Sequence, residues 1–181
     1  MENSRITDVL HFWFEEIQPE TWFRRDPELD AVIRRRFLIL HGALKAENIE
    51  KLNTNPRSAL ASVIVFDQFP RNMFRDAPEA FATDPQARRL ATAAIEARFD
   101  EQLDPHGRQF LYMPFMHSED RGDQERSMVL FESLALAEPL ASAKAHKDIV
   151  DRFGRFPHRN AVLGRVSTPA EIEFVKTTKN F

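Results

Sequence analysis

The chain has 181 residues, of which 43% are hydrophobic and 29% are charged, and its formal net charge is −3. These fractions are ordinary for a globular protein and exclude a disordered or fibrous chain, and the small negative charge gives no electrostatic basis for binding nucleic acid. The sequence contains no cysteine, which excludes disulfides, thiolate catalysis and cysteine-bound zinc or iron–sulfur sites.

The sequence predicts one helical domain over residues 1–181. No linker rich in glycine, serine or proline divides the chain, and its length is enough to bury one substantial core. It has no run of about eighteen apolar residues and no basic stretch followed by an apolar one at the amino terminus. We therefore expect a cytoplasmic protein that binds neither membrane nor nucleic acid. The sequence does not indicate an oligomeric state.

Five helix starts are predicted by a capping residue followed directly by proline. A short polar side chain accepts a hydrogen bond from an unpaired amide, and proline at the first helical position loses no hydrogen bond. The five pairs are Asp26-Pro27, Asn55-Pro56, Asp84-Pro85, Asp104-Pro105 and Thr168-Pro169. Glu171 completes a capping box with Thr168.

Apolar residues recur at helical spacing along most of the chain. The predicted helices cover residues 9–17, with Thr7 as the cap, about twenty residues from Pro27, and then 56–69, 85–99, 105–118, 121–138, 140–153 and 169–176. Short connections make successive helices antiparallel, so the predicted fold is all-α, a stack of antiparallel helical hairpins.

One order of residues occurs twice, in 66–72 and in 153–160. Both segments read Phe-x-x-Phe-Pro and continue to Arg-Asn, and each follows an apolar helix. We interpret both as helix stops, in which proline ends the helix and Arg and Asn bind the last carbonyls.

Four polar residues occupy positions where the helical pattern calls for an apolar one. They are Asp67, His117, Gln124 and His146. Burying such groups costs several kcal/mol unless they are hydrogen-bonded, so they should meet one another or meet partners near the helix ends. Local explanations exist: Asp67 would pair with Arg71 one turn on, and the histidines would donate to backbone carbonyls.

If the two Phe-Pro segments and the turn after His117 converge, they form a cleft lined by carboxylates, imidazoles and guanidiniums. The candidate catalytic residues are His117, Asp67 and Glu119, and the candidate ligand-binding residues are Gln68, Arg71, Asn72, Gln124, His146, Arg155, His158, Arg159 and Asn160. The histidine and carboxylate spacing does not match a metal site, and no cofactor motif is present. We expect neither metal nor cofactor.

Five blocks of the sequence together resemble one bacterial family. They are residues 9–14, 67–75, 81–85, 110–120 and 154–165, which are spread over nearly the whole chain. The family is catalogued as domain of unknown function nine-two-four. The resemblance implies a tetratricopeptide-like α-α superhelix and assigns neither an activity nor a catalytic residue.

Three hypotheses for function follow. In the first, the protein is a binding module for a small anionic ligand or an acidic peptide end, held by Arg71, Arg155 and Arg159. In the second, it is an acid–base enzyme in which His117 is the general base, tuned by Asp67 or Glu119. In the third, the polar residues are structural and a protein partner carries the function. The sequence favours the first and third over the second.

Overall fold

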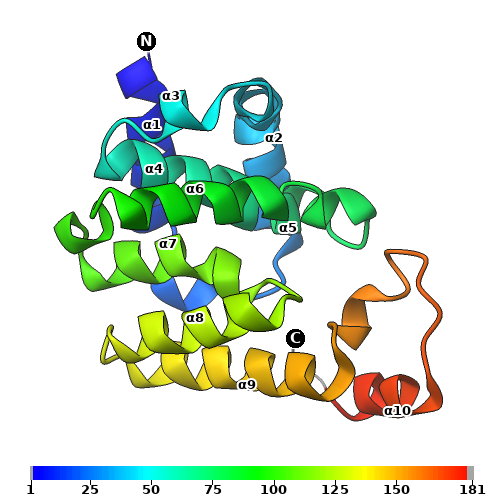
Figure 1. Cartoon of the computed structure of the whole chain (residues 1–181). Coiled ribbons are helices and arrows are strands. Elements are labelled where there is room, and N and C mark those ends of the chain that lie inside the picture. Colours follow the sequence, from blue (N-terminus) through cyan, green and yellow to red (C-terminus); the bar gives the residue numbers. More distant parts are fainter. Residues whose placement is uncertain (1, 179–181) are drawn as a thin grey trace. The chain divides into compact units, whose positions relative to one another are not determined.

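The computed structural model describes residues 2–178 and, within that range, contains helices and no strand (Figure 1). The predicted all-α fold is confirmed, whereas the tetratricopeptide-like superhelix stays a prediction. The chain divides into two compact units. The first comprises Met1–Arg75 and Glu79–Pro114, and the second comprises Asp76–Pro78 and Phe115–Phe181. That residues 1–181 form a single domain also stays a prediction.

The first unit is built from helices packed around aromatic side chains. Its α-helices are α1 (Glu2–His11), α2 (Pro27–Lys45), α3 (Ile49–Leu52), α4 (Pro56–Val63), α5 (Phe69–Met73), α6 (Asp84–Glu96) and α7 (Pro105–Met116), and the boundary with the second unit falls within α7. Helix α4 packs on α1 and α6, and α2 packs on α5. The rings of Phe37 and Phe69 lie 4.6 Å apart, and those of Trp13 and Phe110 lie 5.4 Å apart. These aromatic rings supply much of the apolar area that stabilises the unit.

The second unit contains a helical hairpin followed by a short helix. Helices α8 (Arg121–Glu132) and α9 (Ala137–Phe153) pack side by side (Figure 1), and α10 (Pro169–Thr177) packs on the 3₁₀ turn η6 (Pro157–Arg159). Helix α9 ends at Gly154, whose φ of 70° is left-handed and favours glycine. Residues Ile149, Val150 and Phe156 form a core cluster in this unit.

Helices begin at all five predicted positions, and four of the five predicted caps are confirmed. Asp26 accepts from two amides of α2, Asn55 accepts from Ser58 N, Asp104 accepts from Gly107 N at 2.7 Å, and Thr168 forms the predicted capping box with Glu171. The prediction that Asp84 is a cap is wrong. Thr83 occupies the N-cap of α6, and Asp84 is the first residue of the helix. The carboxylate of Asp84 binds Arg71 instead of an amide.

The predicted start at Thr7 and the predicted stop at Phe69-Pro70 are also wrong. Thr7 lies inside α1, which begins at Glu2 and continues into a π-helical turn, Phe12–Glu16. Helix α4 continues through a second π-helical turn, Ile64–Gln68, into α5, so Pro70 lies within a helical run. A π turn relieves the clash of a proline ring with the preceding turn. Of the two similar segments, only the second, residues 153–160, lies at the end of a helix. The two segments therefore differ in structure.

The chain compensates for the hydrogen bond that Pro70 cannot make. Pro70 has no N–H to donate to the carbonyl four residues earlier, which is that of Phe66. The buried hydroxyl of Thr83 donates to Phe66 O at 2.7 Å, and the ring Nε2 of His41 lies 3.5 Å from the same hydroxyl. Thr83 thus satisfies a buried carbonyl that the proline leaves without its helical donor.

We expect Thr83→Val to lower the free energy of unfolding by about 1–3 kcal/mol, because the variant has the same shape but leaves the buried carbonyl of Phe66 without this donor. Urea unfolding followed by circular dichroism measures the change. Thr21→Val is the matched control, since the hydroxyl of Thr21 also donates to a carbonyl at 2.7 Å but is exposed. Equal effects of the two substitutions would contradict the interpretation.

Candidate functional site

The predicted site residues of the first unit bind one another. Asp67 is fully buried, and the guanidinium of Arg71 contacts its carboxylate at 3.4 Å and donates to its backbone carbonyl. The same guanidinium forms two hydrogen bonds with the carboxylate of Asp84, at 3.0 and 3.1 Å. Burial lowers the pKa of Arg71, but Asp67 and Asp84 raise it by more, so the net shift is upward. This is a partly buried ion triad at the π turn.

Gln68 and Asn72 extend this network within the first unit. The amide of Gln68 donates to Asp67 Oδ2 at 2.6 Å and contacts the sulfur of Met113 at 3.7 Å. The amide of Asn72 donates to Asp30 at 2.8 Å, and Arg75 binds the same carboxylate. These hydrogen bonds connect α2, α5 and the π turn. The contacts support the local explanation for Asp67, which is that it pairs with Arg71 one turn on.

Three of the four inward-facing polar residues lie close together in the second unit. Gln124 is fully buried at the start of α8, and its amide donates to Met116 O at 2.7 Å and to Ser118 O at 2.6 Å. These two carbonyls flank His117, so Gln124 fixes the turn that carries the imidazole. The rings of His117 and His146 lie 5.9 Å apart.

The buried ring of Phe156 is the centre of a cluster of imidazole and guanidinium groups. The rings of His146 and His158 lie 5.5 and 5.6 Å from it, and the guanidinium carbon of Arg159 lies 4.5 Å from its centroid. Together with His117, these residues are called the Phe156 cluster below. They come from the turn after α7, from α9, and from η6 and its N-cap. The site therefore unites residues separated by about forty positions in the chain.

The carboxylates of Glu119 and Glu171 bind the segment of residues 155–165, which carries most of the Phe156 cluster. Glu119 accepts from both terminal nitrogens of Arg165, at 2.7 and 2.9 Å, and from Phe156 N at 2.8 Å. Burial raises the pKa of Glu119, but the hydrogen bonds from Arg165 and Phe156 lower it by more. Arg155 holds Glu171 in the same bidentate way, at 2.6 and 2.8 Å, and lowers the pKa of Glu171 to about 2. Both carboxylates are accordingly ionised at neutral pH.

The histidines His146 and His158 of the Phe156 cluster are neutral at pH 7. Burial, the neighbouring His117 and the charge of Arg159 lower the pKa of His146 to about 3. Burial and Arg159 lower the pKa of His158 to about 4, although Glu119 acts in the opposite direction. The Nδ1 atom of His146 lies 2.8 Å from Ser142 O, which fixes the proton of the neutral ring on Nδ1 and makes Nε2 an acceptor.

Two polar atoms beside the Phe156 cluster are buried without a hydrogen-bond partner among the described residues. One is the Nε–H donor of Arg165, whose terminal nitrogens are engaged, and the other is Oδ1 of Asn160. Asn160 is fully buried, and its Nδ2 donates to Ser167 at 3.0 Å. Buried polar atoms are normally hydrogen-bonded, so these two mark places where a water or a ligand group fits.

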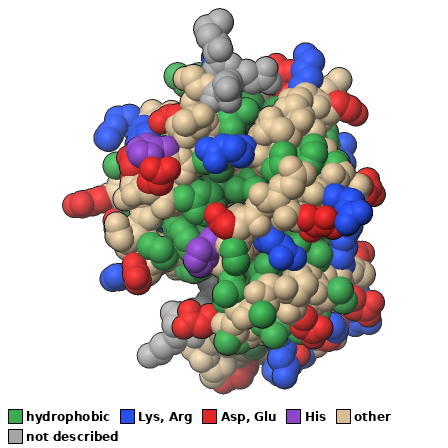
Figure 2. All heavy atoms as spheres, turned by 90° about the vertical axis from the view of Figure 1, so that its left-hand side faces the viewer, with side chains coloured by type: hydrophobic (Ala, Val, Ile, Leu, Met, Phe, Trp, Pro, Cys, Tyr) green, Lys and Arg blue, Asp and Glu red, His purple; other side chains and the backbone are tan. Residues whose placement is uncertain are grey.

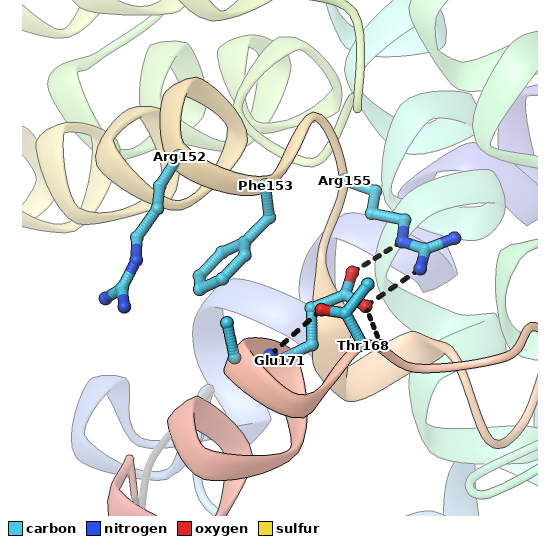
Figure 3. A pocket seen from close by; sticks show the side chains of 6 residues that line it. Arg152, Phe153, Arg155, Thr168 and Glu171 are labelled. Carbon is cyan, nitrogen blue, oxygen red and sulfur yellow. Dashed lines mark hydrogen bonds and ion pairs between the residues drawn. The ribbon is translucent and has the colours of Figure 1, made fainter.

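A separate hollow of about 490 Å³ lies on the α10 side of the second unit. Its walls are Arg152, Phe153, Arg155, Thr168, Ala170 and Glu171. Arg155 and Glu171 point toward one another, whereas Arg152 points away from that pair (Figure 3). The guanidinium of Arg152 stacks on Phe153 at 4.6 Å.

On the face shown in Figure 2, positive and negative side chains are mixed and do not form an area of one sign. Lys, Arg, Asp and Glu are interspersed there among apolar side chains, and no continuous basic stripe runs across the described residues of this face. Among residues 2–178, no group of three or more histidine or acidic side chains is arranged to hold a metal ion.

No helix within the described range combines the length and the apolar character that a membrane span requires.

Some contacts of the site join residues that are far apart in the chain, and the sequence did not indicate them. Arg165 lies 46 positions from Glu119, and neither residue carries a local signal of the other. Glu171 was visible only as a capping residue, yet its carboxylate also binds Arg155. Phe156 reads as part of a helix stop, and its role as the centre of the cluster needs the folded geometry. The excess of arginine in residues 152–165 was the one available signal.

The fold and these contacts define an all-helical protein with a cluster of histidine and arginine side chains around a buried phenylalanine in its second unit. The model of a family of bacterial proteins of unknown function, DUF924, matches residues 9–179, and the chain belongs to this family. A solved structure titled a protein of unknown function, ATU0120, from Agrobacterium tumefaciens is 36% identical and superposes with a TM-score of 0.93, over 98% of this chain and 100% of that one. Comparison with curated proteins gives no match.

Proposed function

We propose that the protein is a binding module for a small oxyanion and that the Phe156 cluster in the second unit is the binding site. The observation that carries the proposal is the buried guanidinium of Arg159, which lies over Phe156 beside the imidazoles of His146 and His158. A guanidinium removed from water binds carboxylate and phosphate oxygens strongly because the local dielectric is low.

The charge balance of the surrounding segment supports this proposal. The segment of residues 155–165 carries the guanidiniums of Arg155, Arg159 and Arg165. The carboxylates of Glu119 and Glu171 bind this segment, so these five side chains together have a formal charge of one positive unit. Burial is the main cause of the lowered pKa values of His146 and His158, and the charge of Arg159 lowers both further.

The network of the first unit supports a structural role for its polar residues. Asp67, Gln68, Arg71 and Asn72 bind one another or neighbouring side chains at the π turn. We therefore limit the proposed site to the second unit. The acid–base hypothesis has less support, because both oxygens of Glu119 are engaged by Arg165 and Phe156 N.

We expect Arg159→Gln to abolish stabilisation by small anions. For the wild type, an oxyanion at one hundred times its Kd adds about 2.7 kcal/mol to the free energy of unfolding, or roughly 5–10 °C in Tm for a chain of this size. The measurement is the ligand-induced change in Tm in a panel of acetate, citrate, sulfate and phosphate, with each variant compared with itself in the absence of anion.

Two further variants separate the site from its surroundings. Arg152→Gln, which alters the neighbouring hollow, should leave the anion response unchanged, and Arg159→Lys, which keeps the charge, should retain part of it. Loss of the response in Arg152→Gln with retention in Arg159→Gln would move the site to the hollow and refute the proposal. The absence of any response in the wild type would refute it as well.

A further inference from the structure

Helix α10 of the second unit buries a charged side chain and exposes apolar ones. The buried residue of this helix is Glu171, which Arg155 binds at 2.6 and 2.8 Å, whereas Ile172 and Val175 are 45% and 43% exposed. An amphipathic helix of a globular protein normally has the opposite arrangement. We propose that the exposed face of α10 binds the same face of a second copy of this chain, with the two helices antiparallel.

The large hydrophobic side chains that are exposed in the described part of the chain concentrate near this helix. Four of the seven belong to residues 163–175: Leu163 and Val166 precede α10, and Ile172 and Val175 lie on it. Single exposed hydrophobic side chains are common, but such a concentration is typical of an interaction surface. Ile172 and Val175 are three positions apart and lie on one face of the helix, so these two residues are called the α10 stripe below.

The contacts of α10 with its own unit fix the orientation of the α10 stripe. Arg155 binds both oxygens of Glu171, and the two side chains point toward one another (Figure 3). The ring of Phe174 lies 5.1 Å from the ring of Phe153 in α9. The helix therefore presents its exposed face without rearrangement of the unit, which lowers the entropic cost of binding a partner.

The exposed charges of α10 favour a second copy as the partner. Glu173 and Lys176 are exposed, and helical spacing places both on the same flank of the α10 stripe. In an antiparallel pair with a two-fold axis beside Phe174, Glu173 of each copy lies within one residue rise, about 1.5 Å along the helix, of Lys176 of the other. Ile172 is equally close to level with Val175. The pair thus joins unlike charges twice and covers both apolar stripes.

We expect the purified full chain to be in equilibrium between monomer and dimer. Two turns of helix bury less area than a standard interface, so sedimentation equilibrium should give a dissociation constant on the order of 100 µM. Ile172→Lys places a charge on the α10 stripe and should raise this constant about tenfold or more. Val175→Lys is a second variant with the same expected effect. Circular dichroism and Tm show whether each variant folds.

Ile39→Lys is the matched control for these substitutions. Ile39 is 86% exposed on α2 in the first unit, so the change introduces the same charge at an exposed isoleucine outside the proposed interface. It should leave the dissociation constant unchanged.

Exchange of charges tests the antiparallel arrangement. Glu173→Lys leaves two positive charges beside the α10 stripe and Lys176→Glu leaves two negative ones, so each variant alone should dimerise roughly three- to tenfold more weakly than the wild type. An equal mixture of the two variants joins unlike charges again and should recover the wild-type affinity as a heterodimer. Sedimentation velocity with one of the variants labelled measures this heterodimer.

Three results would overturn the proposal. A wild-type chain that stays monomeric up to about 500 µM, several times the expected dissociation constant, would leave the exposed face of α10 for a partner of another sequence. Dimerisation unchanged in both Ile172→Lys and Val175→Lys would place the interface elsewhere. A mixture of the charge variants that binds no better than either alone would exclude the antiparallel pair. The proposed anion site contributes none of these side chains, so its own test succeeds or fails separately.

Discussion

Replacing Arg71 by methionine is expected to lower the free energy of unfolding of the protein by about 3–5 kcal/mol. The substitution keeps most of the apolar volume but removes the cation that faces Asp67, which is fully buried, and Asp84, which is nearly so. Two carboxylates would be left in a poorly hydrated environment, and the carbonyl of Asp67 would lose a donor. Urea denaturation at pH 7, followed by circular dichroism, measures the loss.

An exposed pair provides the control for this substitution. Arg98→Met removes an ion pair with Glu101 in which both side chains are more than half exposed, so the change should stay within about 0.5 kcal/mol. Adding Asp84→Asn to Arg71→Met should recover part of the stability, because one of the unbalanced charges is then removed. An effect of Arg71→Met that is no larger than that of Arg98→Met would show that the triad does not stabilise the π turn.

Stability is expected to fall steeply as the pH decreases from 6.5 to 5. The folded-state pKa values of His146 and His158 are about 3 and 4, below the 6.5 of an unperturbed histidine. The unfolded chain therefore binds protons in this range while the folded chain does not. The free energy of unfolding decreases by up to about 1.4 kcal/mol per pH unit for each such histidine. Above about pH 7.5 the histidines are neutral in both states and their contribution is constant.

The interval from pH 6.5 to 5 isolates the histidines, because Glu119 and Glu171 have lowered pKa values and protonate only under more acidic conditions. His41 adds to the slope with the same sign, since burial and Lys45 lower its pKa. The double variant His146→Gln/His158→Gln should have a clearly flatter pH profile than the wild type. Identical slopes in the two proteins would contradict the assignment.

Local patterns in the sequence predicted the helices well where a cap begins them. Four capping residues act as their chemistry requires, because a helix start depends on neighbours within three positions. The π turn at Ile64–Gln68 was not predicted, because the apolar residues around it fit an ordinary helix and proline suggested an end. The hydroxyl that donates to Phe66 O in this turn belongs to Thr83, which lies thirteen positions beyond Pro70 and comes from another element.

The candidate site was predicted in part. Helical spacing correctly placed Asp67, His117 and Gln124 at buried positions, whereas His146 is half-buried. It could not indicate that Asp67 belongs to a network in the first unit, or that Glu119 binds Arg165 rather than an imidazole. Pairing between segments depends on the packing of the whole unit, which a one-dimensional pattern does not contain.

The hydroxyl of Thr83 beneath Pro70 has a consequence for how relatives of this chain diverge. A relative with a non-proline residue at the position of Pro70 has an amide hydrogen there. That amide can donate to the carbonyl of residue 66, so the hydroxyl at position 83 is no longer needed as its donor. Substitutions at positions 70 and 83 should therefore occur together. A chain in which only one of the two is substituted should be less stable than a chain in which both are. In an alignment of the family, this pair should covary more strongly than either site does with its sequence neighbours.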